Sequence, residues 1–353
     1  MKKNTIKFFF PELSKVNQNL DVENPEFWKT DASYTNIITY KAWLYYTYIQ
    51  LKKANYPVEI HETLPLDGTI VILADETSRN ILDRNYKKLS KDAFVIAIRA
   101  DEIEFRYLLA DIEIVQNGKY ANNKNCFFVP HWPHPGIIKR NNERGTAVKN
   151  IVYKGGRGNL DQMFSSQKWL DFLDKNNLNF VLDTEENNIE TYHWHDYSEA
   201  DVIVAVRPSF DNHDRSDKPA LKLVNCWFAG VPAILGKEYA FYEQRKSELD
   251  YFQAETIDEV ISAIKKLIET PSMYQQMVNN GFERSKVFTP ENITSIWSGI
   301  LLSEVPKVKE SLSFKVSKIR SKNLKKFLSL ILINHTYFEW RQRLRYIIKN
   351  KKK

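Results

Sequence analysis

Residues 217–236, DKPALKLVNCWFAGVPAILG, give the clearest indication of the fold class. The first residues predict a loop, the middle part predicts a helix, and the turn Gly230–Val231–Pro232 is expected to end that helix. Glycine suits the C-cap of a helix, and proline cannot continue one. The apolar residues after the turn predict a short buried strand. A helix that feeds directly into a buried strand is the repeating step of an α/β protein with a parallel sheet.

The same alternation of strand and helix fills the chain on both sides of one linker. Residues 130–149, PHWPHPGIIKRNNERGTAVK, have the proline, glycine and charge that are typical of a linker between domains. Continuous apolar runs flank this linker, and such runs indicate strands buried on both faces of a parallel sheet. The expected strands are residues 6–10, 58–60, 69–73, 94–98, 112–115 and 126–129 before the linker, and 150–154, 180–182, 202–206 and 231–235 after it. The pattern predicts two Rossmann-like, doubly wound α/β domains.

The domain boundaries follow from this linker. We expect residues 1–148 to form an N-terminal domain and residues 149–289 to form a second domain. A helix over residues 290–306 is expected to cross back to the first domain, and residues 307–353 form a basic tail. Within the second domain, Thr256 and Glu259 have the spacing of a capping box. Ligands of such sheets bind at the carboxyl ends of the strands, so we expect the site in a cleft between the two domains.

The composition limits the classes of protein that fit. A chain of 353 residues with 43% hydrophobic and 13% aromatic residues can form about two packed domains. Cys126 and Cys226 stand far apart and form neither a metal-ligand motif nor a disulfide framework. The N-terminal MKKNTIKFFFPEL has too short an apolar stretch for a signal peptide. No run reaches the ~18 apolar residues of a membrane-spanning helix, so we expect a cytoplasmic protein.

The start of the expected helix over residues 221–228 can bind an anion. The N-terminus of a helix presents backbone N–H groups and the positive end of the helix dipole, which suit a diphosphate. Lys218 and Lys222 lie four residues apart and can share one face there. The alternative is an ordinary helix that Asp217 caps and that carries two solvated lysines.

The stretch over residues 217–236 resembles the signature region of GT-B-fold nucleotide-sugar glycosyltransferases of the family 1 and family 4 type. Many members carry a Glu, seven residues, a second Glu, and then small residues that end in Gly-x-Pro. Here Asp217 and Asn225 stand at the two Glu positions. The resemblance implies that Lys222 neutralises the leaving diphosphate and that Asn225 hydrogen-bonds the nucleotide. The donor-site residues that it implies here are Asp217, Lys218, Asn225, Gly230 and Pro232.

Two further segments carry the resemblance. Residues 194–202, WHDYSEADV, lead into an expected strand that ends near Arg207 and resemble the approach to the donor site. Residues 155–159, GGRGN, follow the first strand of the second domain, where members of this superfamily face the donor phosphates. Glycine allows a close backbone approach, and arginine offers a fork of donors; the alternative is a plain turn. The resemblance thus implies donor contacts from Gly155, Gly156, Arg157 and His195, and a catalytic role for Arg207 beside Lys222.

Three residues are expected on the acceptor side. Arg99 and Asp101 follow the strand over residues 94–98 and should face the cleft. His131 and His134 stand in the linker, where an imidazole that titrates near neutrality can act as a general base. The alternative for these two histidines is a structural hinge framed by prolines. We keep Arg99, Asp101 and His131 as acceptor-side candidates.

A GT-A enzyme with a bound metal ion is the alternative fold. Asp183-Thr184-Glu185 follows an expected strand and imitates the Asp-x-Asp motif that holds a divalent metal on a diphosphate in such enzymes. The motif lies inside the second α/β series, which favours the GT-B fold. In that fold, cationic side chains and a helix end stabilise the leaving diphosphate, so we expect neither a metal nor another cofactor.

The tail over residues 307–353 carries fifteen Lys and Arg against Glu310 and Glu339. Since the whole chain has a net charge of +7, the preceding residues are net negative. Basic residues alternate with aromatic and apolar ones in the tail, which favours a peripheral contact with an anionic membrane surface. A solvated extension is the alternative. Nucleic acid is not expected, because no nucleic-acid-binding motif accompanies the charge.

These features together predict a metal-independent GT-B glycosyltransferase. It would move a sugar from a nucleoside-diphosphate donor to a glycan or lipid-linked acceptor, in the synthesis of a bacterial cell-surface polysaccharide. Two alternatives stay open. One is a nucleotide-sugar epimerase of the same fold, and the other is a catalytically silent nucleotide-sugar-binding module tethered to a membrane by its tail.

Overall fold

The structure is a computed structural model that describes residues 5–28, 35–90, 92–100, 107, 109–122, 124–184, 194–208 and 218–311. Asp101, Asp217 and Glu185 of the predicted sites lie outside these residues, as does the tail beyond residue 311. The chain divides into two compact units, residues 1–300 and residues 301–353. Both sheets belong to the first unit.

The first sheet has six parallel strands in the order β2-β1-β3-β4-β5-β6. The strands are β1 (Ile6–Phe9), β2 (Val58–His61), β3 (Thr69–Leu73), β4 (Phe94–Ile98), β5 (Ile112–Val115) and β6 (Cys126–Phe128). Every residue of β3, β4 and β5 is buried, as the continuous apolar runs predicted. The six predicted strands before the linker are therefore confirmed.

One helical stretch beside this sheet contains a π-helical turn. The chain from residue 35 to residue 53 forms α2 (Thr35–Tyr40), a π-helical turn η3 (Lys41–Tyr45) and α3 (Tyr46–Lys53). The periodicity gave no sign of the π-helical turn, since such bulges insert locally into a continuous helix. The remaining helices are α1 (Pro25–Trp28) and α4 (Glu76–Asn85), of which α4 begins at an Asp75 N-cap.

The second sheet has five parallel strands in the order β11-β10-β9-β7-β8. The strands are β7 (Asn150–Lys154), β8 (Asn179–Asp183), β9 (Val202–Ala205), β10 (Ala233–Leu235) and β11 (Phe252–Gln253). The four predicted strands of this half are confirmed. The prediction missed β11, because a strand of two residues has no period to detect.

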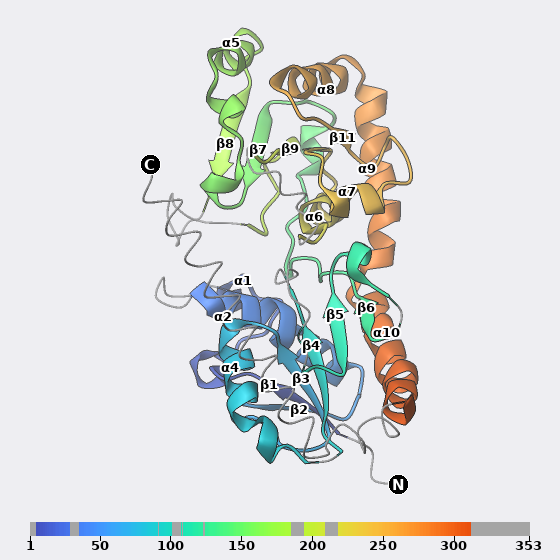
Figure 1. The fold of residues 1–353 in the computed structure, drawn as a ribbon. Helices are drawn as coiled ribbons and strands as arrows, with labels where there is room; N and C mark the ends of the chain where they lie inside the picture. Colours follow the sequence, from blue (N-terminus) through green and yellow to red (C-terminus); the bar gives the residue numbers. More distant parts are fainter. Residues whose placement is uncertain are drawn as a thin grey trace. The chain divides into compact units, whose positions relative to one another are not determined.

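Five helices accompany the second sheet. They are α5 (Gln167–Lys175), α6 (Leu221–Ala229), α7 (Tyr239–Gln244), α8 (Ile257–Glu269) and α9 (Pro271–Ser285). The capping box of Thr256 and Glu259 is present at the start of α8, as predicted. The helices α5 and α8 lie side by side (Figure 1), and an ion pair between Lys168 and Asp258 joins them.

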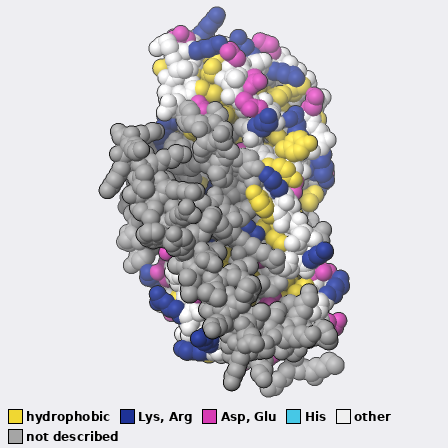
Figure 2. Space-filling view, in the orientation of Figure 1, with side chains coloured by type: hydrophobic (Ala, Val, Ile, Leu, Met, Phe, Trp, Pro, Cys, Tyr) yellow, Lys and Arg dark blue, Asp and Glu magenta, His cyan; other side chains and the backbone are white. Residues whose placement is uncertain are grey.

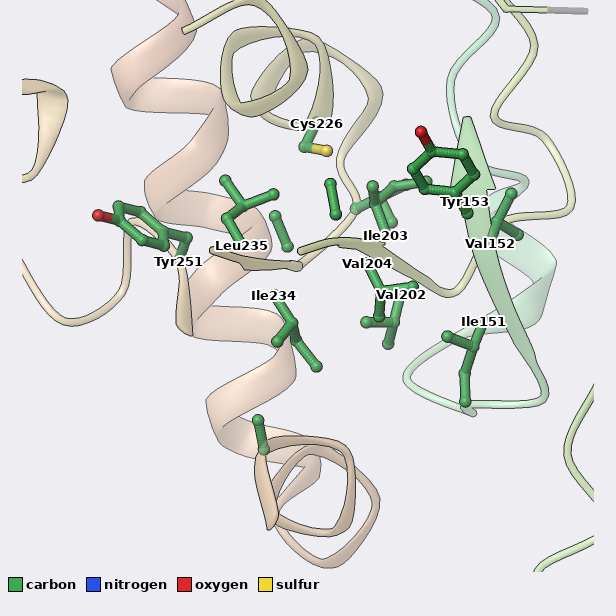
Figure 3. Close-up of a cluster of buried hydrophobic side chains, with 14 of the residues drawn as sticks. Ile151, Val152, Tyr153, Val202, Ile203, Val204, Cys226, Ile234, Leu235 and Tyr251 are labelled. Atoms are coloured by element: carbon green, nitrogen blue, oxygen red, sulfur yellow. The ribbon is translucent and has the colours of Figure 1, made fainter. Parts of the chain in front are cut away.

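One hydrophobic core fixes the second sheet under α6 (Figure 3). Ile151, Val152 and Tyr153 come from β7, and Val202, Ile203 and Val204 come from β9. Ile234 and Leu235 of β10, Cys226 of α6 and Tyr251 complete the labelled part of this cluster. Because Leu223, Val224, Cys226, Trp227 and Ala229 of α6 are buried in this cluster, the packing fixes where the first turn of the helix lies.

Buried Asp201 holds the linker to the second sheet. Its carboxylate accepts hydrogen bonds from Arg140 (Nη2, 2.7 Å), from Arg144 (Nη2, 2.7 Å) and from the main-chain N–H of Lys149 and Asn150 (2.8 Å each). The Asp201 side chain is fully buried, and its pKa lies below the usual value although burial opposes the shift, because these donors stabilise the carboxylate. The linker therefore enters β7 in one fixed direction.

The helix α10 (Pro290–Gly299) follows α9, and a second π-helical turn η10 (Ile300–Glu304) continues it. The Tyr56 hydroxyl, just before β2 of the first sheet, donates to the Ser298 hydroxyl of α10 at 2.5 Å. Within residues 1–300, α10 therefore contacts the segment that leads into β2 of the first sheet.

The surface of the described residues shows mixed charge. On the face drawn in Figure 2, Lys and Arg side chains are scattered among acidic and polar ones. In the part of the chain that the structure describes, no helix has the length and apolar character needed to cross a membrane.

Candidate functional site

Lys222 lies in the first turn of α6, and its ammonium reaches the carboxyl end of β7. Its Nζ donates a hydrogen bond of 2.5 Å to the carbonyl oxygen of Lys154, the last residue of β7. The same Nζ lies 5.4 Å from the centroid of the Tyr153 ring, over its face. The N-cap of α6 is Ala220, which supplies no side-chain hydrogen bond to the first turn. A cation and a helix N-terminus without a side-chain cap therefore meet at one sheet edge, an arrangement that attracts anions.

Gly155 makes room for this ammonium. Its φ is +138°, which side chains rarely adopt, and a Cβ there would lie 2.7 Å from Lys222 Nζ. The Tyr153 hydroxyl donates to the Gly156 carbonyl oxygen at 2.7 Å, which fixes the loop after β7. The first glycine of the GGRGN segment is thus required by the backbone and by Lys222 together.

Lys154 supplies a second cation at this edge, and an acid balances it. Its Nζ donates to Asp183 Oδ2 at 2.5 Å, and it lies 5.1 Å from the centroid of the Tyr197 ring. Asp183 is the first residue of the alternative metal motif, and its carboxylate is engaged by this ammonium. Among the residues that the structure describes, no group of three His, Cys, Asp or Glu has the arrangement of a metal site.

Asn225 contacts the linker rather than open space. Its Oδ1 accepts from the His134 main-chain N–H at 3.1 Å, and its Nδ2 lies 3.0 Å from His134 Nδ1. Burial holds the pKa of His134 well below its usual value, and His131 and Lys222 add to this shift. The neutral ring then accepts at Nδ1 from the amide and carries its proton on Nε2. The Asn225 side chain, only 2% exposed, therefore contacts His134 through both its oxygen and its nitrogen.

An indole ring closes this part of the site. The Trp194 ring meets His134 edge to face at 4.1 Å between centroids, and it meets Trp28 of α1 in the same way at 5.9 Å. His195 lies next to Trp194, is 9% exposed, and its carbonyl oxygen accepts from the Ile138 N–H. The predicted donor-site residue His195 thus sits beside the linker, close to His134.

Arg207 holds the GGRGN loop. Its Nε donates to Glu238 Oε1 at 3.0 Å, and its Nη1 donates to the Asn159 side-chain oxygen. Glu238 is 6% exposed and precedes α7, so its carboxylate balances the guanidinium. Arg157 of the same loop donates to the Ser165 hydroxyl at 3.3 Å. These contacts connect the carboxyl end of β9 to the loop after β7.

Gly230 and Pro232 lie at the opposite end of α6 from Lys222. Gly230 is the left-handed C-cap with φ +71°, and a Cβ there would lie 2.6 Å from the Phe282 ring. The Pro232 carbonyl oxygen accepts from the Ile203 N–H at 3.0 Å. A helix of nine residues is about 13 Å long. The structure therefore gives these two residues a role in the turn into β10.

The two described acceptor-side candidates, Arg99 and His131, have different contacts in the structure. Arg99 is 6% exposed and pairs with Glu113 at 3.6 Å, so it is part of an internal ion pair. His131 Nδ1 donates to the Trp132 carbonyl oxygen at 2.5 Å, and its ring lies 4.0 Å from the Trp43 ring between centroids. His131 also lines a pocket with Leu221 and Val224 of α6.

The structure therefore brings Lys222, Gly155, Gly156, Asn225 and His195 into one region. Arg207, Arg157 and Arg99 instead contact neighbouring side chains of the protein. Sequence reasoning missed Lys154, Tyr153, Trp194 and the pairing of His134 with Asn225. The signal for Lys154 was its place at the end of a predicted strand, directly before two glycines. Trp194 entered only as the first residue of the segment over residues 194–202, and nothing in the sequence marks Tyr153 or the pairing of His134 with Asn225.

No family model matches this chain, and no curated protein matches it. Among solved structures, it is similar to sucrose-phosphate synthase from Thermosynechococcus elongatus. The TM-score is 0.52 at 11% identity, over 84% of this chain and 98% of that one. Anabaena HepE in complex with UDP and glucose gives a TM-score of 0.49 at 11% identity, over 85% and 99% of the two chains. A glycosyltransferase from Rickettsia africae gives 0.46 at 9% identity, over 86% and 100%. The two parallel sheets and the first of these similarities show the GT-B fold.

Proposed function

We propose that this chain is a glycosyltransferase that transfers a sugar from a nucleoside-diphosphate donor to a glycan or lipid-linked acceptor, without a metal ion. One observation carries the proposal. The Lys222 ammonium is held on the Lys154 carbonyl oxygen, against Gly155, beside the N-terminus of α6. A diphosphate is the anion of a nucleotide sugar that such a place can hold.

The chemistry requires charge stabilisation at this place. When the bond between the anomeric carbon and the diphosphate oxygen breaks, negative charge grows on the departing nucleoside diphosphate. Lys222 and the first N–H groups of α6 are fixed before the reaction, so they stabilise that charge without reorganising. Arg207 contributes by holding the GGRGN loop in place, because Glu238 already balances its charge.

On the acceptor side, we propose that His131 contacts the acceptor. It lines a pocket with Leu221 and Val224 of α6, close to the helix that carries Lys222. Arg99 acts there through its ion pair with Glu113, which orders the carboxyl end of β4. The likeness to a sucrose-phosphate synthase supports sugar chemistry on this fold, and the substrates are proposed from the site itself.

Calorimetric titration with a panel of nucleoside diphosphates (uridine, guanosine, adenosine, cytidine and thymidine) tests the proposal. We expect at least one of them to bind, and Lys222→Ala to weaken that binding roughly tenfold to a hundredfold, the range for a hydrogen bond to a charged group. Lys265→Ala is the matched control, because Lys265 is an exposed lysine of α8. Absence of binding, or equal affinity in Lys222→Ala, would contradict the proposal.

Turnover of the nucleotide sugar separates the proposal from its two alternatives. A transferase consumes the donor faster when an acceptor is present and releases the nucleoside diphosphate. An epimerase converts the nucleotide sugar without any acceptor and releases no diphosphate. A binding module does neither, although it binds the nucleotide.

The peripheral membrane contact of residues 307–353 stays part of this proposal. It rests on the basic and aromatic composition of the tail. Sedimentation with vesicles that contain anionic lipid tests it on the full chain and on a chain that ends at residue 306. Equal partitioning of both chains would remove the membrane from the proposal.

A further inference from the structure

The turn that follows β5 begins at a buried side chain and is sharply defined. It consists of Asn117 and the single 3-10 turn Gly118–Tyr120, and Asn117 Oδ1 caps it by accepting from the Lys119 N–H at 3.1 Å. Asn117 is fully buried, with 0% of its surface exposed. An uncharged polar side chain in such a place needs partners for all its polar atoms.

The second partner of Asn117 lies in the other half of the chain. Its Nδ2 donates to the carbonyl oxygen of Lys218 at 3.3 Å. Lys218 stands just before α6, which begins at Leu221. A residue at the carboxyl end of the first sheet therefore holds the backbone that leads into the helix of Lys222.

The next residue of the turn fixes the same region from a second direction. The Gly118 N–H donates to Glu243 Oε2 of α7 at 3.0 Å. A Cβ on Gly118 would lie 1.8 Å from Glu243 Oε1, so any other residue would displace the Glu243 carboxylate from the Gly118 N–H. Burial raises the pKa of the Glu243 carboxyl, and the Gly118 N–H opposes that shift. This close approach is the physical reason for a glycine here.

The cation that follows adds a weaker contact. Lys119 Nζ lies 5.6 Å from the centroid of the Tyr239 ring of α7 and 5.9 Å from that of Tyr120. Contacts of this kind at such distances contribute little where water has access. Lys119 therefore offers a matched control on the same turn.

From these contacts we infer that Asn117 is a positioning residue for the donor end of α6, and that Gly118 and Glu243 hold its turn in register. Asn117 fixes the Lys218 carbonyl and so fixes the direction in which the first turn of α6, with Lys222, faces the donor. It acts through the backbone and contacts no substrate. The inference rests on the proposed function for its consequence in binding, but the contact itself can be tested without any ligand.

Asn117→Asp separates positioning from capping. An aspartate keeps the oxygen that accepts from the Lys119 N–H and so keeps the turn, but it has no N–H to give to the Lys218 carbonyl. Amide hydrogen exchange of the peptide that spans residues 218–224 is the ligand-free measurement. We expect exchange there to be about fivefold faster in Asn117→Asp than in the unchanged chain, the effect of one lost hydrogen bond. Lys119→Ala should leave that peptide unchanged.

Binding of the nucleoside diphosphate that the unchanged chain prefers is the second measurement. We expect Asn117→Asp to weaken it about fivefold, whereas Lys119→Ala should leave it unchanged. If Asn117→Asp does not fold, Asn117→Ser serves in its place, because a serine oxygen can still cap the turn while the amide that donates to the Lys218 carbonyl oxygen is lost.

The outcomes separate this inference from the proposed function. Faster exchange over residues 218–224 in a chain that binds no nucleotide supports the positioning role and contradicts the proposed function. Unchanged exchange in Asn117→Asp or its substitute overturns the positioning role, whatever the nucleotide does. Equal loss of protection across the whole chain also overturns it, since that result shows a general loss of stability.

Discussion

Two hydrogen bonds join the Asn225 side chain to His134. Oδ1 accepts from the His134 main-chain N–H at 3.1 Å, and Nδ2 lies 3.0 Å from His134 Nδ1. Because an amide nitrogen can only donate, the ring must accept at Nδ1 and be neutral. Burial and the nearby Lys222 favour the same state, since both keep the pKa of His134 low. The pair ties the linker to α6 at the residue that follows the catalytic candidate Lys222 by one helical turn.

Asn225→Asp should reverse the pH dependence of this pair. In the unchanged chain the pKa of His134 lies below the unfolded value of about 6.5. The free energy of unfolding is therefore highest above that pH, and it decreases as the pH falls because the unfolded chain takes up the proton first. With aspartate, a carboxylate faces Nδ1, so the pKa of His134 rises in the folded state. The stability from that shift is present at low pH and lost as the pH rises through the new value.

Urea unfolding at pH 5.5 and pH 8 measures this reversal. Between these two pH values the free energy of unfolding of the unchanged chain should rise relative to that of Asn225→Asp. At pH 8 the variant should be less stable by about 1–3 kcal/mol, the cost of an unsatisfied buried group. Parallel pH trends in the two chains would show that His134 does not accept from Asn225.

Gly155→Ala should displace Lys222, whereas Gly158→Ala should not. An alanine at residue 155 has a strained φ and a Cβ 2.7 Å from Lys222 Nζ, while a Cβ on Gly158 meets nothing within 4 Å. We expect Gly155→Ala to lose about 1–3 kcal/mol of stability and to weaken nucleoside diphosphate binding toward the level of Lys222→Ala. Calorimetry and thermal unfolding of both variants check this. Equal behaviour of the two alanine variants would contradict the role of Gly155.

The fold was predictable because its strands are continuous apolar runs. Those of β3, β4 and β5 are buried over their whole length, so hydrophobicity marks them directly. The π-helical turn η3 was not predictable, because Lys41 and its neighbours fit an ordinary helical period and only tertiary packing reveals the bulge. The fold class can therefore be predicted from the sequence pattern alone, whereas a local feature such as the π-helical turn can be recognised only once the packing is known.

The place of Lys222 in the fold was predictable, and its contacts were less so. Lys222 follows from its place in the first turn of a helix after a strand, and the structure sets it at the carboxyl end of β7. The nucleotide contact of Asn225 stays a prediction, and the partner that the structure gives it, His134, stands 91 residues away in the linker. Arg207 was predicted to be catalytic, and Glu238, 31 residues away, takes up its charge. No spacing rule encodes such pairings, because they arise from how the elements pack.

Lys41 should make stability rise with pH above neutrality. Its ammonium donates to the Phe27 carbonyl oxygen at 2.6 Å and lies 4.8 Å from the centroid of the Phe27 ring, and burial lowers the pKa of Lys41 to about 8. The unfolded chain binds the proton more tightly, so the cost of the buried charge is present below pH 8. It is relieved as the pH rises toward the unfolded value of about 10.4.

A comparison of Lys41→Met with the unchanged chain isolates this effect. Between pH 7 and pH 10 the unchanged chain should gain stability relative to Lys41→Met, by at most about 3 kcal/mol, the energy of the pKa difference. Lys53→Met is the control, because Lys53 is an exposed lysine of the following helix α3. A gain of the same size against both variants would show that Lys41 is not the group responsible.

Asp201→Asn should be far more damaging than Glu199→Gln, although both acids pair with Arg144. The Asp201 carboxylate is fully buried and also holds Arg140 and two main-chain N–H groups, while the Glu199 side chain is 69% exposed. An amide at residue 201 is neutral, so it leaves the buried Arg140 uncompensated. Breaking one side of a buried ion pair costs about 3–5 kcal/mol, whereas an exposed pair contributes about 0–1 kcal/mol.

Chemical denaturation of the two variants measures the difference, and limited proteolysis of the linker over residues 138–149 shows where it acts. We expect Asp201→Asn to unfold at lower urea concentration and to be cut in the linker, because Arg140 and Arg144 then no longer fix it to β9. Since the same linker carries His134 to Asn225, nucleoside diphosphate binding should also weaken in this variant. A stable Asp201→Asn chain with an uncut linker would mean that the apolar packing of β7 and β9 orders the linker without this carboxylate.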